Sequence, residues 1–243
     1  MIFYKQAFKP KVLSFDLDNT IYDCETVLRK AENWFASYLC ERYKLESKFQ
    51  DYMFWGDIKR DCLKNRPELV NDVTLLREVG LIEAFKLFGK TLTKQEAQDL
   101  VKVFIHERSK GDVSEKMKYF LKKLKKYYIV CSISNGNSDT SVLGIKDIFE
   151  EDFRPDIKEN AAKPASDLFF KCASFYGVSP KDILHIGDDP FTDVTGSVKA
   201  GCQSAWVYRG YTGISPDERF LKVVPTLSID SVYELEDWLL SGV

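Results

Sequence analysis

The chain has 243 residues, of which 44% are hydrophobic and 30% charged, and its 35 Lys and Arg nearly balance 37 Asp and Glu. This balance excludes the basic surface typical of nucleic-acid-binding proteins, and no run of about 18 apolar residues is present to span a membrane. Six cysteines without C-x-x-C spacing predict free thiols in a reducing compartment. The first ten residues lack a long apolar signal segment, so we expect a cytoplasmic protein.

The first feature along the chain is an apolar run at 12–16, which ends in Asp16 and is followed by Asp18 and Thr20. Its β-forming side chains predict a buried strand. Two carboxylates at the end of such a strand repel each other unless a cation lies between them, and Mg²⁺ is the hard cation that oxygen ligands suit best. An Asx-type turn after the strand explains the same residues without any ligand.

A helical block follows. Apolar residues at helical spacing predict helices within 27–39, 49–63 and 71–88, and Thr93 with Glu96 forms a capping box that opens a fourth. No strand signal is present between 23 and 108. We therefore expect an inserted all-helical cap domain at 23–110.

From Gly111 onward, helices alternate with strands. Helical patterns cover 117–124, 165–176, 191–200 and a last helix opened by the Ser231/Glu234 capping box; strand patterns cover 127–133, a segment near 153, 183–186, 204–208 and 227–229. This alternation predicts an α/β fold with a doubly wound parallel sheet, Rossmann-like in its core. The first strand belongs to that sheet, so the core domain is discontinuous and comprises 1–22 and 111–243.

Polar clusters follow three of the predicted strands: Asp16 to Thr20, Ser134 to Asn137, and Gly187 to Asp193. The carboxyl ends of parallel strands meet at one edge of a sheet, which brings the clusters together. Lys163-Pro164 lies between the second and third clusters. A nucleophile, a metal site, a fixed cation and hydroxyl or amide donors are the parts that phosphoryl transfer requires.

These residues also resemble a known family. Asp16-x-Asp18-x-Thr20, Ser134, Lys163-Pro164 and Gly187-Asp188-x4-Asp193 match, in order, the four motifs of the haloacid dehalogenase-like (HAD) hydrolase superfamily, and the helical insertion resembles its type-one cap. A closer resemblance is to a bacterial subgroup of FMN and 5-amino-6-(5-phospho-D-ribitylamino)uracil phosphatases. It rests on the segments 134–137, 185–189 and 192–196, and on 72–74 with Arg77 in the cap.

The resemblance implies a role for each motif residue. Asp16 would be the nucleophile that forms an aspartyl-phosphate, and Asp18 the general acid and base, with a pKa that its neighbouring acid helps to raise. Lys163 would bridge the nucleophile and the phosphate. Ser134 and the Asn135 amide would bind phosphate oxygens. Mg²⁺ would be bound by Asp16, the Asp18 carbonyl and Asp188, supported from further out by Asp193 and Thr20.

Each assignment has an alternative. Asp189 is the alternative to Asp188 as the metal ligand, and we favour Asp188. The alternative for Lys163 is a surface lysine, and for Asp193 an acid favoured at a helix start. His185, within a strand, is interpreted as a buried structural residue. Tyr22 and the group Tyr52, Phe54 and Trp55 either stack on a flat ring or pack in the cap, and we favour packing.

The predicted function is hydrolysis of a small phosphomonoester such as FMN or a riboflavin-pathway phosphate, with no nucleic-acid or membrane partner, by a monomer or weak homodimer. Sugar or nucleotide monophosphates are alternative substrates, and a phosphomutase is an alternative enzyme. A 2-haloacid dehalogenase is disfavoured because its chemistry needs neither Asp18 nor Asp188. A non-catalytic binding module is disfavoured because Asp16 and Lys163 are both present.

Overall fold

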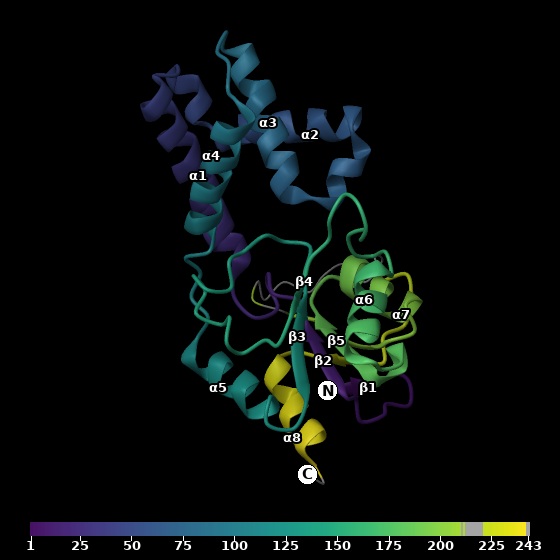
Figure 1. Ribbon diagram of the computed structural model, residues 1–243. Helices are drawn as coiled ribbons and strands as arrows, with labels where there is room; N and C mark the ends of the chain where they lie inside the picture. The colour runs from purple at the N-terminus through teal and green to yellow at the C-terminus, as the bar shows by residue number, and fades with distance from the viewer. Residues whose placement is uncertain (210, 212–220, 242–243) are drawn as a thin grey trace.

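The computed structural model describes residues 1–209, 211 and 221–241. Within this part of the chain, seven strands form one sheet in the order β1-β7-β6-β5-β2-β3-β4 (Figure 1). The strands are β1 (Ile2–Phe3), β2 (Val12–Phe15), β3 (Ile129–Ile133), β4 (Asp152–Phe153), β5 (Ile183–Gly187), β6 (Gln203–Val207) and β7 (Leu227–Ile229). All neighbours pair in parallel except β1 and β7. The predicted α/β fold is thereby confirmed.

Strand β1 was not predicted and is the antiparallel member of the sheet. It has two residues, both exposed, and pairs Ile2 with Ser228 and Phe3 with Leu227. Two residues are too few to show an alternation of apolar and polar side chains, so local pattern carries no signal for such a strand. Its position depends on pairing with a segment more than 220 residues away in the chain.

The inserted block contains four α-helices: α1 (Cys24–Tyr43), α2 (Tyr52–Asn65), α3 (Val73–Leu87) and α4 (Lys94–Arg108). Two short 3-10 helices, Ser47–Gln50 and Pro67–Asn71, connect the first three. Their apolar side chains, among them Phe35, Trp55 and Phe104, form a core separate from those of the sheet. The block stands above the sheet in Figure 1, as an all-helical cap, and the Thr93–Glu96 capping box is confirmed. The exact domain limits at 22/23 and 110/111 stay a prediction.

Helices cover both faces of the sheet. Helices α5 (Glu115–Leu124) and α8 (Leu235–Leu240) pack on the face that presents Leu13 and Phe15 of β2. Helix α6 (Asp167–Tyr176) packs on the opposite face with Val12, and α7 (Gly196–Lys199) lies on the same side of the sheet in Figure 1. No helix of the described residues has the length and apolar character needed to cross a bilayer.

The helix predicted at 191–200 is shorter and less regular than expected. One π-helical turn spans Pro190–Thr195, and α7 follows it. The Asp189 side chain caps this turn by accepting hydrogen bonds from the backbone N–H groups of Phe191 and Thr192, at 2.8 and 2.6 Å. The wider turn sets the position of Asp193.

Candidate active site

The three polar clusters meet at the carboxyl edge of the sheet, as their positions in the sequence predict. Asp16 follows β2, which lies between β3 and β5, the strands that precede Ser134 and Asp188. A cavity of about 240 Å³ opens there. Its lining includes all but one of the predicted site residues: Asp16, Asp18, Ser134, Asn135, Lys163, Asp188 and Asp193. The exception is Thr20, whose hydroxyl donates a 3.0 Å hydrogen bond to Asp188 Oδ1 from outside the lining.

Lys163 is the central cation of this site. Its ammonium donates hydrogen bonds to Asp16 Oδ1 at 2.8 Å, to Asp193 Oδ1 at 2.5 Å and to the Ile133 carbonyl at 2.7 Å. The residue is only 3% exposed, so its interpretation as a surface lysine is wrong. Asn135 fixes the Lys163 backbone from both sides, donating to its carbonyl at 2.8 Å and accepting from its N–H at 2.9 Å.

The pKa values of the carboxylates around Lys163 are shifted in opposite directions. Burial, reinforced by neighbouring carboxylates, raises the pKa of Asp16 to about 7 against the attraction of Lys163, and raises the pKa of Asp188 to about 8. Burial acts on Asp193 as well, but the charge of Lys163 and the hydrogen bond from His185 outweigh it and hold the pKa of Asp193 well below its usual value. The site therefore holds more potential negative charge than one lysine neutralises.

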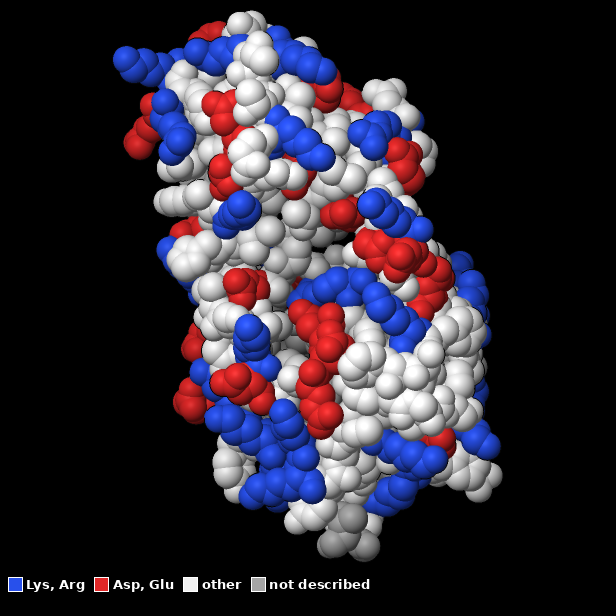
Figure 2. Space-filling model, viewed as in Figure 1, with Lys and Arg blue, Asp and Glu red and all other residues white. Residues whose placement is uncertain are grey.

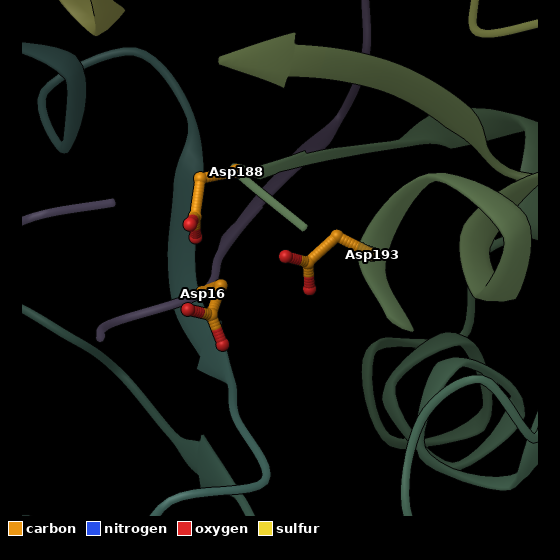
Figure 3. Close-up of side chains that lie close together, drawn as sticks. All are labelled: Asp16, Asp188 and Asp193. Atoms are coloured by element: carbon orange, nitrogen blue, oxygen red, sulfur yellow. The ribbon is translucent and has the colours of Figure 1, made fainter. Parts of the chain in front are cut away.

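This excess of carboxylate oxygens fits a divalent cation. One oxygen each from Asp16, Asp188 and Asp193 lies within 4.8 Å of the others, and Figure 3 shows the three side chains directed toward one another. An all-oxygen donor set on a rigid sheet edge suits Mg²⁺. Both oxygens of Asp193 already accept hydrogen bonds, from Lys163 and His185 on one side and from the Asp189 N–H on the other. Asp16 and Asp188 are thus the freer ligands.

Asp193 is fixed by its neighbours rather than by its place at a helix start. It is 2% exposed, and His185, fully buried as predicted, lies between Ser14 Oγ at 3.0 Å and Asp193 Oδ1 at 3.1 Å. Gly187 allows this arrangement, because a Cβ atom there would lie 2.3 Å from Asp193 Cγ. The alternative metal ligand Asp189 caps the following turn, and Asp188 is the residue that joins the acidic cluster.

Asp18 is held differently from our expectation. Its Oδ1 accepts a 2.5 Å hydrogen bond from the Tyr22 hydroxyl and its Oδ2 a 2.9 Å hydrogen bond from Arg108 Nη2. Burial alone would raise the pKa of Asp18, but the charge of Arg108 and these hydrogen bonds keep it below its usual value. The predicted upward shift for Asp18 is therefore wrong for this structure, and the shift by burial and neighbouring acids is found at Asp16 instead.

Sequence reasoning missed Arg108 and the role of Tyr22. A signal for Arg108 was present, since it follows Leu100 and Phe104 at intervals of four and so continues the apolar face of α4, where a charged residue is unusual. Tyr22 is fully buried, and its hydroxyl contacts Asp18 rather than lining a ring-binding surface. Phe54 and Trp55 pack in the cap core, as expected.

A second cavity, of about 440 Å³, extends from the cavity at the sheet edge into the cap. The two share Asp18, Asn135 and Gly136 in their linings, and Figure 2 shows the surface hollowed between the helical block and the sheet. Apolar side chains such as Leu76 and Phe104 form part of its wall. Its charged residues are Asp18, Glu32, Lys59, Arg60, Arg77 and Arg108, which amount to four cations and two carboxylates.

Three of these charges form one network. Glu32 accepts two hydrogen bonds from Arg77, at 2.6 and 3.1 Å, and one from Lys59 at 2.9 Å. Burial would raise the pKa of Glu32, but the hydrogen bond and charge of Arg77, with those of Lys59, lower it to about 2. The network joins α1, α2 and α3 beside the cavity.

Comparison with known proteins is consistent with this geometry. The haloacid dehalogenase-like hydrolase family model matches residues 10–201. A 5-amino-6-(5-phospho-D-ribitylamino)uracil phosphatase from Escherichia coli (strain K12) is 30% identical over 85% of this chain and 87% of its own. The N-acylneuraminate-9-phosphatase of Homo sapiens is 24% identical over 95% of this chain and 94% of its own.

A solved structure shows the same fold. The 2-haloacid dehalogenase from Pseudomonas syringae pv. Tomato DC3000 superposes with a TM-score of 0.79 at 24% identity, over 96% of this chain and 100% of that one. At this identity the likeness concerns the fold and not the reaction. Because the family model covers most of the chain and includes every strand that lines the site, the protein belongs to the haloacid dehalogenase-like hydrolase family.

Proposed function

We propose that the protein is a Mg²⁺-dependent phosphomonoester hydrolase that acts through an aspartyl-phosphate intermediate. The observation that carries this proposal is the contact of the buried Lys163 ammonium with Asp16, at the edge of a cavity that also contains Asp188 and Ser134. A carboxylate nucleophile beside a fixed cation and free carboxylate ligands is suited to phosphoryl transfer. A relative with 30% identity is named as a phosphatase, which supports the same reaction.

In the first step, an Asp16 carboxylate oxygen attacks phosphorus, and the bond from phosphorus to the ester oxygen breaks. For this step Asp18 must take up a proton when substrate binds, because Arg108 and Tyr22 keep its pKa below the usual value in the free protein. It then gives that proton to the departing oxygen. In the second step, Asp18 takes a proton from a water that attacks the aspartyl-phosphate, which releases phosphate and regenerates Asp16. Lys163 balances the charge of Asp16 and the phosphate, and Ser134 with the Asn135 N–H binds phosphate oxygens.

Mg²⁺ would be held by Asp16, Asp188 and the Asp18 carbonyl, with Asp193 and Thr20 outside the ligands. When bound, it supplies positive charge that neutralises phosphate oxygens. Asp193 has both carboxylate oxygens engaged by other partners, which suits a supporting position. Thr20 orients Asp188 through its 3.0 Å hydrogen bond.

The substrate we propose is FMN or another phosphate of riboflavin metabolism. The cap cavity supports this choice, since it combines apolar walls at Leu76 and Phe104 with cationic donors at Lys59 and Arg77. Such a surface suits a flat heterocycle that presents carbonyl oxygens. The E. coli relative acts on a phosphate of this kind by its name.

The test is a phosphate-release screen over a panel of phosphorylated metabolites, run with Mg²⁺ and with EDTA. Mg²⁺-dependent turnover that is highest for FMN or the ribitylaminouracil phosphate would support reaction and substrate together. Highest turnover for sugar or nucleotide phosphates would keep the reaction and reject the substrate. Absence of turnover for every compound, with the protein folded, would reject the hydrolase. The Asp16→Asn variant, purified in parallel, controls for contaminating phosphatases.

A further inference from the structure

Arg108 is a buried cation in the gap between the cap and the catalytic edge. It is the last residue of α4, where the chain leaves the cap, and only 3% of it is exposed. Its side chain lines the cap cavity together with Asp18, Asn135 and Gly136. A guanidinium stays charged at any pH relevant here, so burial at this place needs acceptors to compensate.

The acceptors around Arg108 do not satisfy its five N–H groups. Nη2 donates to Asp18 Oδ2 at 2.9 Å and approaches Cys24 Sγ, a weak acceptor, at 3.1 Å. Nη1 reaches only Asn137 Oδ1, at a long 3.4 Å, and Nε has no acceptor among the described residues. One strong acceptor for a buried guanidinium leaves donor capacity for a ligand oxygen.

Gly136 keeps space open beside both charged groups. A Cβ atom at this position would lie 2.4 Å from Asp18 Oδ2 and 3.7 Å from Arg108 Nη1. The residue also belongs to the lining shared by the catalytic and cap cavities. Any leaving group that crosses from one cavity to the other therefore passes next to the Asp18–Arg108 pair.

We propose that Arg108 binds an oxygen of the leaving group close to the scissile ester oxygen, and so selects phosphomonoesters of polyols over those of simple alcohols. This inference rests on the proposed function, in which Asp18 contacts the ester oxygen. Arg108 Nη2 donates a hydrogen bond directly to Asp18. A hydroxyl on the carbon next to the ester lies about 3 Å from the ester oxygen and within reach of the guanidinium.

The test compares two substrates with the same phosphate and the same five-carbon chain, ribitol 5-phosphate and n-pentyl phosphate. Both alcohols need protonation as they leave, but only ribitol carries neighbouring hydroxyls. In Arg108→Met, kcat/KM for ribitol 5-phosphate is expected to fall roughly ten- to a hundredfold more than kcat/KM for n-pentyl phosphate, chiefly through KM. Arg60→Met is the matched control, since Arg60 lines the same cavity with a largely exposed side chain, and is expected to leave the substrate ratio unchanged.

Equal losses for the two substrates would overturn the inference, because they would mean that Arg108 acts only by positioning Asp18. Arg108→Ala, which also has no side-chain donor, provides the same ratio if the Met variant fails to fold, and there too an unchanged ratio rejects the proposal. Calorimetric binding of ribitol 5-phosphate to Asp16→Asn, with and without Arg108→Met, gives a second readout without turnover; weaker binding in the double variant is expected. Folded wild-type protein that hydrolyses FMN but not ribitol 5-phosphate would reject the polyol inference alone, whereas absence of turnover for FMN and the whole panel would reject the proposed function.

Discussion

Lys163 Nζ lies 2.8 Å from Asp16 Oδ1, although 147 positions separate the two residues in the chain. The same ammonium lies 2.5 Å from Asp193, so one buried cation is shared by two buried carboxylates. Removing the shared cation would leave two buried carboxylates without compensation, and a loss of that kind usually costs about 3–5 kcal/mol. Asp16, the proposed nucleophile, and Asp193 are therefore held by one shared cation.

Asp16→Asn is expected to abolish turnover without loss of folding. Asn keeps the shape and an oxygen acceptor for Lys163, but its amide is not a nucleophile. Because burial and neighbouring acids disfavour the charge of Asp16, its removal is expected to leave the melting temperature unchanged or higher. Phosphate release and thermal unfolding measure the two effects. Asp189→Asn, which retains a capping side chain outside the acidic cluster, is the control, and turnover by Asp16→Asn at the control's rate would contradict the mechanism.

Stabilisation by Mg²⁺ is expected to increase with pH. The folded-state pKa values of Asp16 and Asp188, about 7 and about 8, lie above the ordinary value of 3.8, so the metal-free protein loses stability as pH rises from about 4 through these values. A cation binds the deprotonated pair and offsets that loss. The rise in melting temperature on adding Mg²⁺ should therefore be larger at about pH 9 than at about pH 5.

Thermal unfolding with Mg²⁺ and with EDTA, at both pH values, checks this expectation. Asp188→Asn removes one carboxylate ligand and should lose most of the Mg²⁺ effect at the higher pH. A shift of equal size at both pH values, or a full shift in Asp188→Asn, would argue against a metal site at these two residues.

The positions of the site residues were predictable because they depend on topology. Asp16, Ser134 and Asp188 each follow an apolar strand, and parallel strands bring their carboxyl ends to one edge whatever the details of packing. The acids and the lysine come together for the same reason. Which of the two adjacent acids, Asp188 or Asp189, joins the cluster depends instead on the turn that follows β5, where Asp189 is the capping residue.

The state of Asp18 was not predictable from its neighbours in the chain. Its partner Arg108 is 90 positions away and comes from the last turn of a cap helix. A local argument counts only the neighbouring acid in the chain. In the fold, burial raises the pKa of Asp18, and the charge of Arg108 with the hydrogen bonds from Tyr22 and Arg108 lowers it by more. Strand β1 was missed for a related reason, since its pairing with β7 is set by tertiary contacts.

Glu32→Gln is expected to destabilise the cap at neutral pH but not in acid. The folded-state pKa of Glu32, about 2, lies below the ordinary 4.5, so its contribution is present above pH 4.5 and is lost as pH falls toward 2. The difference corresponds to a free energy of unfolding on the order of 3 kcal/mol. Urea unfolding at several pH values measures it. Glu83→Gln, which removes an exposed partner of Lys86, is the control and should change little.

The wild type and Glu32→Gln are compared between about pH 2 and 5. If their free energies of unfolding change equally with pH, Glu32 does not have the lowered pKa. Parallel curves of that kind would mean that the network with Arg77 and Lys59 adds no net stability. The buried position of the Glu32 side chain, 12% exposed, makes screening by solvent a minor correction.

Gly136→Ala is expected to lower turnover by displacing Asp18. The added Cβ atom would lie 2.4 Å from Asp18 Oδ2, closer than any stable contact, so the carboxylate must move away from Arg108 and from the ester oxygen. Loss of a positioned general acid typically costs about 10²- to 10⁴-fold in rate. The readout is kcat/KM, which reports the first step and not the hydrolysis of the aspartyl-phosphate that follows it. We expect a large loss of kcat/KM for an alkyl phosphate, whose leaving group needs the proton, and a far smaller loss for p-nitrophenyl phosphate, whose leaving group does not. Gly80→Ala in α3, whose Cβ atom meets only ordinary contacts, is the control, and equal losses of kcat/KM for the two substrates in Gly136→Ala would show that Asp18 is not the acid.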